Sequence, residues 1–285
     1  HGGTHPGGGA LLVEEAPRLV LQGALVLREV EVHGPYYHPR MDLTPTPEQE
    51  AVRAECRAWL EANLPWEYGR GLPPQFDDLA EEFTFLRDWQ ARLAEGGWVA
   101  VTWPEAYGGR GAGPLTHYVV QEELARARAP ELVGRIGINL VGPTLLAHGT
   151  DEQQQRWLPG IRTAGLVFCQ LFSEPGAGSD LAAVATRAER VRGGWRLHGQ
   201  KVWTSYAQFA DHGLCLARTD PDAPKHRGIS ALVVDMAAEG VEVRPLTQVT
   251  GEAEFNEVFF DDVFVPDENL VGAEHDGWRV SSSTL

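Results

Sequence analysis

The chain of 285 residues is 43% hydrophobic and 22% charged, the balance of a globular protein that can bury a sizeable core. Its formal net charge of −16 argues against nucleic acid or an anionic membrane surface as the main partner, because both are bound by basic surfaces. No apolar run approaches the roughly 20 residues that span a bilayer, so we expect a soluble protein.

The cysteines and histidines give no sign of a metal or disulfide framework. Cys56, Cys169 and Cys215 lie far apart in apolar segments, which predicts buried, reduced thiols in a cytoplasmic protein. The histidines form neither an HExxH motif nor a Cys/His ligand spacing, so we expect no metal.

Residues 1–40 differ from the rest of the chain. The start "HGGTHPGGGA" is rich in glycine and lacks the basic and apolar regions of a signal peptide, and "LVLQGALVLREVEV" predicts one or two strands. A different pattern opens at Met41. We therefore expect residues 1–40 to be an extension of unclear origin, with Met41 as the true start.

Residues 41–163 have the signals of a helical domain. Thr46 with Gln49, and Thr150 with Gln153, have the spacing of capping boxes at helix N-termini. Apolar residues recur at helical spacing after each of them, and helical patterns also run through "LTHYVVQEELARARA" and "GINLVGPTLLAHG".

The periodicity changes near residue 164. Gly193 and Gly194 predict the turn of a hairpin, and short β-rich runs follow in "HGLCLART", "ISALVVDM", "VEVRPL" and "EVFFDDVFVP". We expect residues 164–273 to form a compact β-barrel or sandwich, and residues 274–285 to begin another helix. The predicted fold class is α+β, a helical domain followed by a β-domain.

The segment "SEPGAGSD" at positions 173–180 is the first candidate for chemistry. Gly176 and Gly178 give the backbone unusual freedom and allow a ligand to approach closely. Successive N–H groups in such a turn, with the Ser179 hydroxyl, can bind a phosphate or pyrophosphate. A plain turn without a ligand is the alternative, and the motif is neither a Rossmann fingerprint nor a P-loop.

The second candidate, "KVWTS", lies about one hairpin further along the chain. Trp203 offers a flat face to a flat ring, and Thr204 and Ser205 can hydrogen-bond a heteroaromatic edge. A core aromatic residue at a strand end is the alternative. Together the two segments favour a dinucleotide that carries a conjugated ring, such as a flavin.

From Met41 to Leu285 the chain resembles the acyl-CoA dehydrogenase family. "SEPGAGSD" and "GQKVWTS" look like the family's flavin-contacting segments. "GWVAVTWPEAYGGRG", "NLVGPTLLAHGTDEQ" and "FNEVFFDDVFVPDENLVG" are also similar to family segments, in family order. The resemblance implies a helical domain, a middle β-domain and a C-terminal four-helix domain that is absent beyond its first residues.

The resemblance assigns residues 170–179 to the flavin. Gln170 and Phe172 would lie along it, Ser173 would bond its pyrimidine edge, and Gly178 and Ser179 would hold the pyrophosphate. Ser179 would also lie near the acyl-CoA. Gln170 stands where many members have an aromatic residue, which leaves its contact in doubt.

The resemblance assigns the second segment to the same cofactor. Trp203 would pack against the flavin on the side away from the substrate. Thr204 belongs to the same flavin-binding segment, and Ser205 would bond near the flavin N5. Serine replaces the common threonine at positions 173 and 205, which keeps the hydroxyl.

The implied reaction is the FAD-dependent α,β-dehydrogenation of an acyl-CoA thioester, with electrons passed to an electron-transfer flavoprotein. The catalytic glutamate would lie beyond Leu285, so we expect no catalytic residue in this chain, which alone should be inactive. A complete protein should form homotetramers or heterotetramers. Two alternatives stay open: a non-catalytic flavin- or acyl-CoA-binding subunit, and a relative with acyl-CoA oxidase or flavin monooxygenase chemistry.

Overall fold

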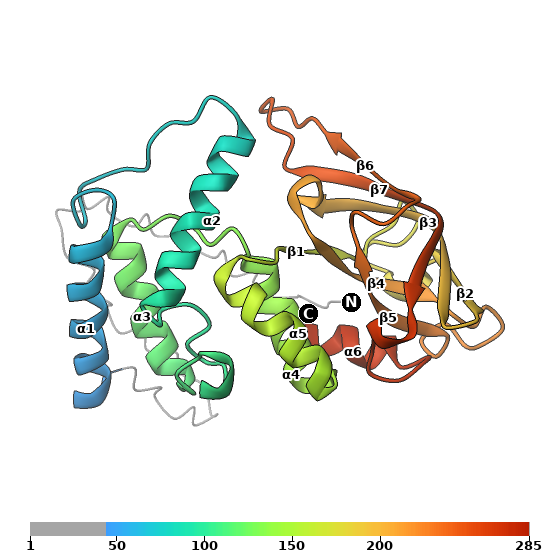
Figure 1. The fold of residues 1–285 in the computed structure, drawn as a ribbon, viewed down its shortest axis with the longest axis horizontal. Helices are drawn as coiled ribbons and strands as arrows, with labels where there is room; N and C mark the ends of the chain where they lie inside the picture. Colours follow the sequence, from blue (N-terminus) through green and yellow to red (C-terminus); the bar gives the residue numbers. More distant parts are fainter. Residues whose placement is uncertain (1–43, 285) are drawn as a thin grey trace, which may run out of the picture. The chain divides into compact units, whose positions relative to one another are not determined.

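The computed structural model describes residues 44–284, a helical part followed by a sheet-rich part (Figure 1). The predictions for residues 1–40 and for a start at Met41 lie outside the described residues. The helices of the first part are α1 (Pro47–Asn63), α2 (Leu79–Glu95), η1 (Glu105–Tyr107), α3 (Pro114–Ala127), η2 (Gly137–Val141), α4 (Gly142–His148) and α5 (Asp151–Thr163).

Both predicted capping boxes form. The Thr46 side chain accepts a hydrogen bond from the Gln49 N–H at the start of α1, and Thr150 does the same with Gln153 at the start of α5. Between them, the segment "GINLVGPTLLAHG", expected to be helical, begins with a π-helical turn, η2, before α4. Where this turn ends, the Trp103 ring packs so closely on Gly142 that a Cβ there would lie 2.0 Å from it.

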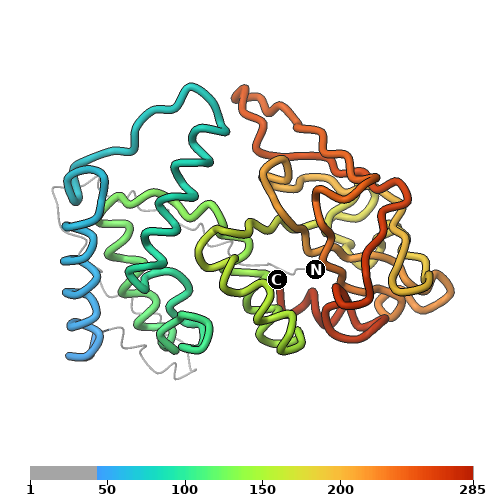
Figure 2. Tube along the Cα trace, viewed as in Figure 1, coloured from blue at the N-terminus to red at the C-terminus, as the bar shows by residue number. Residues whose placement is uncertain are grey.

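The sheet-rich part is one hydrogen-bonded sheet. Figure 2 traces the path of the chain through this part, in colours from yellow to red. The strand order is β6-β7-β3-β2-β4-β5-β8, and β1 pairs with β4 in parallel. Gly193 turns the predicted β2–β3 hairpin with a φ of 82°. The strands are β1 (Phe168–Leu171), β2 (Arg187–Val191), β3 (Gly194–Ser205), β4 (His212–Arg218), β5 (Ile229–Asp235), β6 (Val241–Leu246), β7 (Phe255–Pro266) and β8 (Leu270–Val271).

Both faces of the central strands are buried, which explains their nearly continuous apolar sequence. In β5, Ile229 and Val233 belong to the cluster that also contains the helical residues, whereas Leu232 and Val234 belong to a second cluster. Successive side chains of a strand point to opposite faces, so the helices cover one face and the remaining strands fill the other. The helical part and the sheet thus share one core.

The chain ends in α6 (Gly277–Thr284), as the sequence predicts. This helix packs against both α4 and β5, which places it beside the helical part and the sheet at once (Figure 1). The Thr284 hydroxyl lies 2.8 Å from that of Thr144, and both side chains are buried. The helix therefore fastens the last described residues to the first part of the chain.

A buried carboxylate joins α1 to α3. Glu123 is fully buried on α3 and accepts hydrogen bonds from Arg57 at 2.8 and 2.9 Å and from the Tyr68 hydroxyl at 2.7 Å. Burial alone would raise its pKa, but these donors, with Arg53 beside them, lower the pKa to about 2. The cluster therefore holds a charged carboxylate in the interior.

We expect Glu123→Gln to lower the free energy of unfolding by about 2–3 kcal/mol, because it removes the buried carboxylate that Arg53, Arg57 and Tyr68 share as an acceptor. Since the folded pKa lies below the unfolded value of about 4.3, this stabilisation is present above that pH and fades as the pH falls toward 2. Urea unfolding at neutral and acid pH measures it. Glu122→Gln, a partly exposed neighbour, should cost under about 1 kcal/mol, and equal losses in both variants would contradict the assignment.

Cys56, Cys169 and Cys215 are buried and free, as predicted. Burial raises the pKa of Cys56 to about 12 and that of Cys215 to about 11, so neither thiol ionises near neutral pH. No helix among residues 44–284 is long and apolar enough to cross a membrane. Within the same range, no group of three or more His, Cys, Asp or Glu residues could hold a metal ion.

Candidate functional site

The two candidate segments meet at the start of the loop after β1. The Ser173 carbonyl accepts a hydrogen bond of 2.9 Å from the Val202 N–H of β3. The Lys201 ammonium donates to the Phe172 carbonyl at 3.2 Å and to the Leu216 carbonyl of β4 at 2.7 Å. The two segments are therefore hydrogen-bonded to each other at Ser173 and Val202. That Ser179 and Trp203 face one cleft stays a prediction.

A buried ion pair fixes the loop further. Lys201 Nζ lies 2.7 Å from Glu174 Oε1, and the two side chains are 0% and 7% exposed. The Glu174 carboxylate also accepts hydrogen bonds from the backbone N–H groups of Ala185 and Thr186 at 2.6 and 3.0 Å. Burial opposes ionisation of Glu174, but Lys201 and these donors lower its pKa, so the carboxylate stays charged.

Glycines shape the turn, although in a different way from the one expected. Glu174 and Ala177 exchange two backbone hydrogen bonds of 3.0 Å, which close a tight turn around Gly176. Neither Gly176 nor Gly178 has a positive φ, so no unusual backbone angle requires glycine at either position. A Cβ at either position would meet nothing within 4 Å. The glycines therefore leave open space beside the backbone of the turn.

Trp203 is presented to solvent by a bulge in β3. The pairing of β3 with β7 shifts register between Lys201 and Thr204, and Trp203 has a φ of 58°. Its side chain is 66% exposed and meets the ring of Phe255 edge-on at 6.1 Å. The interpretation of Trp203 as a core aromatic residue is wrong, because the bulge turns the indole out of the sheet and leaves one face free.

Thr204 lies on the other side of the bulge. It is 1% exposed, yet its hydroxyl has no hydrogen-bond partner among the described residues. Its carbonyl accepts a 3.0 Å hydrogen bond from the amide of buried Asn256, whose own Oδ1 has no partner within residues 44–284. Ser205 is half-buried beside them. Buried polar atoms without partners are rare in proteins, and a bound polar ligand is one way of satisfying them.

The remaining candidates lie apart from this junction. Gln170 is half-buried on β1, and its amide nitrogen also has no partner in the part of the chain that the structure describes. Gly178 and Ser179 lie on the turn, where Ser179 is exposed, and no hydrogen bond within the described chain joins them to Trp203–Ser205. Asp180, next in sequence, forms an ion pair with Lys225.

Sequence reasoning misses three residues of this site. It assigns no function to Glu174, and it does not single out Lys201 or Asn256. Lys201 is one of only two lysines in the sequence, and it stands inside an apolar strand pattern, which is an unusual place for an unpaired charge. A lysine inside an apolar strand pattern is therefore the feature of the sequence that could have identified Lys201.

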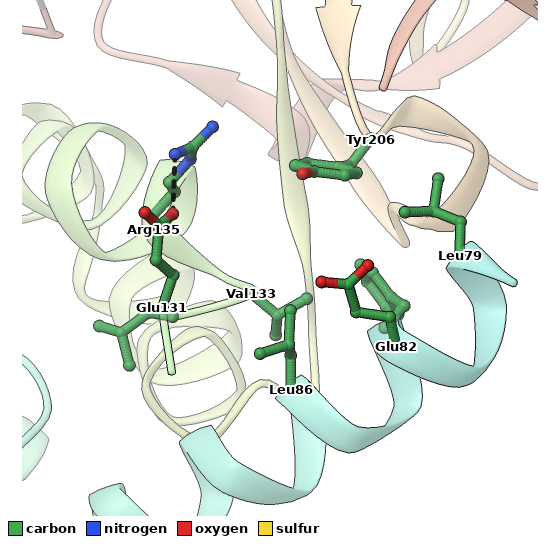
Figure 3. A pocket seen from close by; sticks show the side chains of 9 residues that line it. Leu79, Glu82, Leu86, Glu131, Val133, Arg135 and Tyr206 are labelled. Atoms are coloured by element: carbon green, nitrogen blue, oxygen red, sulfur yellow. Dashed lines mark hydrogen bonds and ion pairs between the residues drawn. The ribbon is translucent and has the colours of Figure 1, made fainter. Parts of the chain in front are cut away.

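Three neighbouring cavities lie along α2, lined by residues outside both segments. The smallest, about 30 Å³, lies between α2 and Tyr206, with Leu79 and Leu86 on one wall and the ion pair of Arg135 and Glu131 nearby (Figure 3). It shares lining residues with a cavity of about 500 Å³ beside α3 and with an acidic groove of about 790 Å³ at the start of α2.

Family models match most of the described chain. Residues 46–164 match the N-terminal domain of acyl-CoA dehydrogenases, and residues 169–263 match the middle domain.

Individual relatives agree with these matches. The chain is 52% identical over 219 residues to acyl-CoA dehydrogenase FadE34 of Mycobacterium tuberculosis, covering 75% of this chain and 30% of the relative. It is 47% identical over 240 residues to acyl-CoA dehydrogenase IpdE1 of the same organism, covering 83% and 62%. The crystal structure of the ChsE4-ChsE5 complex from M. tuberculosis superposes with a TM-score of 0.71 at 36% identity, covering 85% of this chain and 60% of that one. The chain thus spans less than two thirds of each.

Proposed function

The chain belongs to the acyl-CoA dehydrogenase family, and from this premise we propose that the protein binds FAD and takes part in the α,β-dehydrogenation of an acyl-CoA thioester. The observation that carries the proposal is the junction of the 172–174 loop with the 203–205 bulge. There an exposed indole face stands beside a buried hydroxyl, that of Thr204, which has no partner in the described chain.

The residues of the junction suit a flavin. Trp203 has a free aromatic face for a flat ring, and Thr204, Ser205 and Ser173 supply hydroxyl groups for its polar edge. Phe172, at the start of the same loop, is buried in the core that the sheet shares with the helices. FAD would supply the acceptor for the β-hydride.

The turn suits the phosphate-bearing part of the cofactor. Open space beside Gly176 and Gly178 lets a pyrophosphate reach the backbone N–H groups, and the exposed Ser179 hydroxyl can donate to it or to the acyl-CoA. Gln170 would use its amide, which has no partner within residues 44–284, toward the same cofactor.

The α-proton needs a base, and we assign that role to no residue of 1–285. Glu174 is unsuited, because it is buried and Lys201 lowers its pKa, which makes the carboxylate a weak base. We propose that the base is a glutamate beyond Leu285, in a C-terminal helical domain that follows residues 274–285. As part of the same proposal, the helical domain spans residues 41–163 and the β-domain spans residues 164–273.

We also propose that the complete protein passes electrons to an electron-transfer flavoprotein in the cytoplasm and assembles as a homotetramer or heterotetramer. The relatives ChsE4 and ChsE5 crystallised together as a complex, which supports a heteromeric assembly. If no base follows Leu285, this chain is instead the flavin- or acyl-CoA-binding subunit of such an assembly.

Oxygen reactivity separates dehydrogenase from oxidase or monooxygenase chemistry. We expect the protein from the complete gene to be yellow, to bleach when an acyl-CoA is added without oxygen, and to stay bleached for minutes when air is admitted. A protein acceptor should restore the colour. Rapid recovery in air alone would move the protein to the oxidase or monooxygenase alternative, and a protein that never bleaches would refute the proposed reaction.

A further inference from the structure

The bulge that turns Trp203 out of the sheet has an unfavourable backbone conformation. Residues 202 and 203 of β3 lie opposite residue 257 of β7 alone. Trp203 has a φ of 58°, and Tyr206 just after the bulge has a φ of 54°. Residues other than glycine adopt such angles at a cost in free energy, so contacts with the rest of the protein must fix this segment.

A buried side chain of β7 supplies such contacts. Asn256 is 0% exposed. Its amide nitrogen donates to the Thr204 carbonyl at 3.0 Å, to the Glu254 carbonyl at 3.2 Å and to the side-chain oxygen of Gln208. Only the nitrogen of an amide group can donate, so these three oxygen atoms determine which way the group is turned. The Asn256 side chain therefore acts on this segment as a donor.

The acceptors of Asn256 have further contacts of their own. The Glu254 carbonyl also accepts the Tyr206 N–H at 2.8 Å. The Gln208 amide nitrogen donates to the Ala253 carbonyl at 2.9 Å. One buried side chain thus lies at the centre of the contacts between the end of β3, the turn after it and the start of β7.

We propose that Asn256 is a positioning residue for the flavin, which holds Trp203 in the orientation that leaves one face of its indole free. Thr204 directly follows Trp203, so a donor on the Thr204 carbonyl restrains the chain where it leaves the bulge. Without this donor the backbone of Trp203 can relax from its positive φ, and the indole moves with it. The flavin as the ring that stacks there rests on the proposed function, whereas the restraint on Trp203 rests on the contacts of Asn256 alone.

Fluorine NMR of the protein labelled with fluorotryptophan tests the restraint without any cofactor. Trp203→Ala identifies the Trp203 resonance by its absence. In Asn256→Leu, whose side chain branches at the same atom but has no donor, we expect this resonance to shift or broaden. Asn256→Ser, a smaller side chain that keeps one donor, should give a smaller change and provides the test if Asn256→Leu does not fold.

The affinity for FAD, measured in the same variants, tests the consequence for the flavin. Asn256→Leu should weaken FAD binding roughly fivefold, because the indole is no longer fixed in its stacking position. In the Trp203→Ala background the same change should weaken binding less than about twofold, because no indole is left to position. A side chain that only stabilised the fold would weaken binding by the same factor in both backgrounds.

Asn269→Leu is the matched control, because Asn269 is also buried and its amide donates to a strand carbonyl, that of Val233, at 2.7 Å. It should leave both the Trp203 resonance and the FAD affinity unchanged. An unmoved Trp203 resonance in both Asn256 variants, or equal weakening of FAD binding in both backgrounds, would overturn the inference. A parent protein that binds no FAD refutes the proposed function, and a moved Trp203 resonance would then still support the restraint by Asn256.

Discussion

Lys201→Met is expected to lower the free energy of unfolding by about 3–5 kcal/mol and to abolish retention of FAD. The substitution keeps the length of the side chain but leaves the buried Glu174 carboxylate without its cation. It also removes the donor that fastens the Phe172 carbonyl to β3, so the loop before the turn loses its anchor. Urea unfolding and the flavin content of the purified protein measure the two effects.

The second lysine of the sequence provides the control. Lys225 is 47% exposed and pairs with Asp180, so Lys225→Met should cost under about 1 kcal/mol. The double variant Lys201→Met with Glu174→Gln removes both charges and should recover part of the stability lost in Lys201→Met alone. Similar losses for Lys201→Met and Lys225→Met would mean that the buried pair does not hold the loop.

Trp203→Ala is expected to weaken FAD binding roughly five- to hundredfold, because stacking of an aromatic side chain on a flat heterocycle contributes about 1–3 kcal/mol. The fold should tolerate the change, since the indole is 66% exposed and alanine keeps a Cβ at the same positive φ. Titration of FAD followed by its fluorescence gives the affinity.

Two further variants make the Trp203 result specific. Phe264→Ala removes another exposed aromatic side chain of the sheet, 42% exposed on β7, and should leave FAD affinity unchanged. Ser205→Ala should mainly slow flavin reduction by the substrate while FAD is retained. If Trp203→Ala and Ser205→Ala match the parent in both flavin content and reduction rate, the assignment of this segment is wrong.

Local signals carry most of the fold prediction. Thr46 and Thr150 cap their helices through side chains three residues away, and Gly193 turns a hairpin through its own φ, so a short stretch of sequence contains the whole cause. The π-helical turn η2 is not predictable in this way. The Trp103 ring, from a distant part of the sequence, lies against Gly142 where the turn ends.

The location of the site can be predicted from the sequence, but the ion pair and the bulge that shape it cannot. The spacing of the two segments predicts that they meet, and the hydrogen bond between Ser173 and Val202 joins them. The Glu174–Lys201 pair does not follow from the sequence, because Lys201 is also held by Leu216 of a third strand. The outward turn of Trp203 depends on a bulge against β7, which no local pattern indicates.

Hydrogen–deuterium exchange with and without FAD tests the central claim most directly, because it reports binding and its location together. We expect saturable binding of FAD, with slower exchange at the backbone amides of residues 170–179 and 203–205. Absence of FAD binding by the complete protein, or protection confined to other segments, would contradict the assignment of these residues to a flavin.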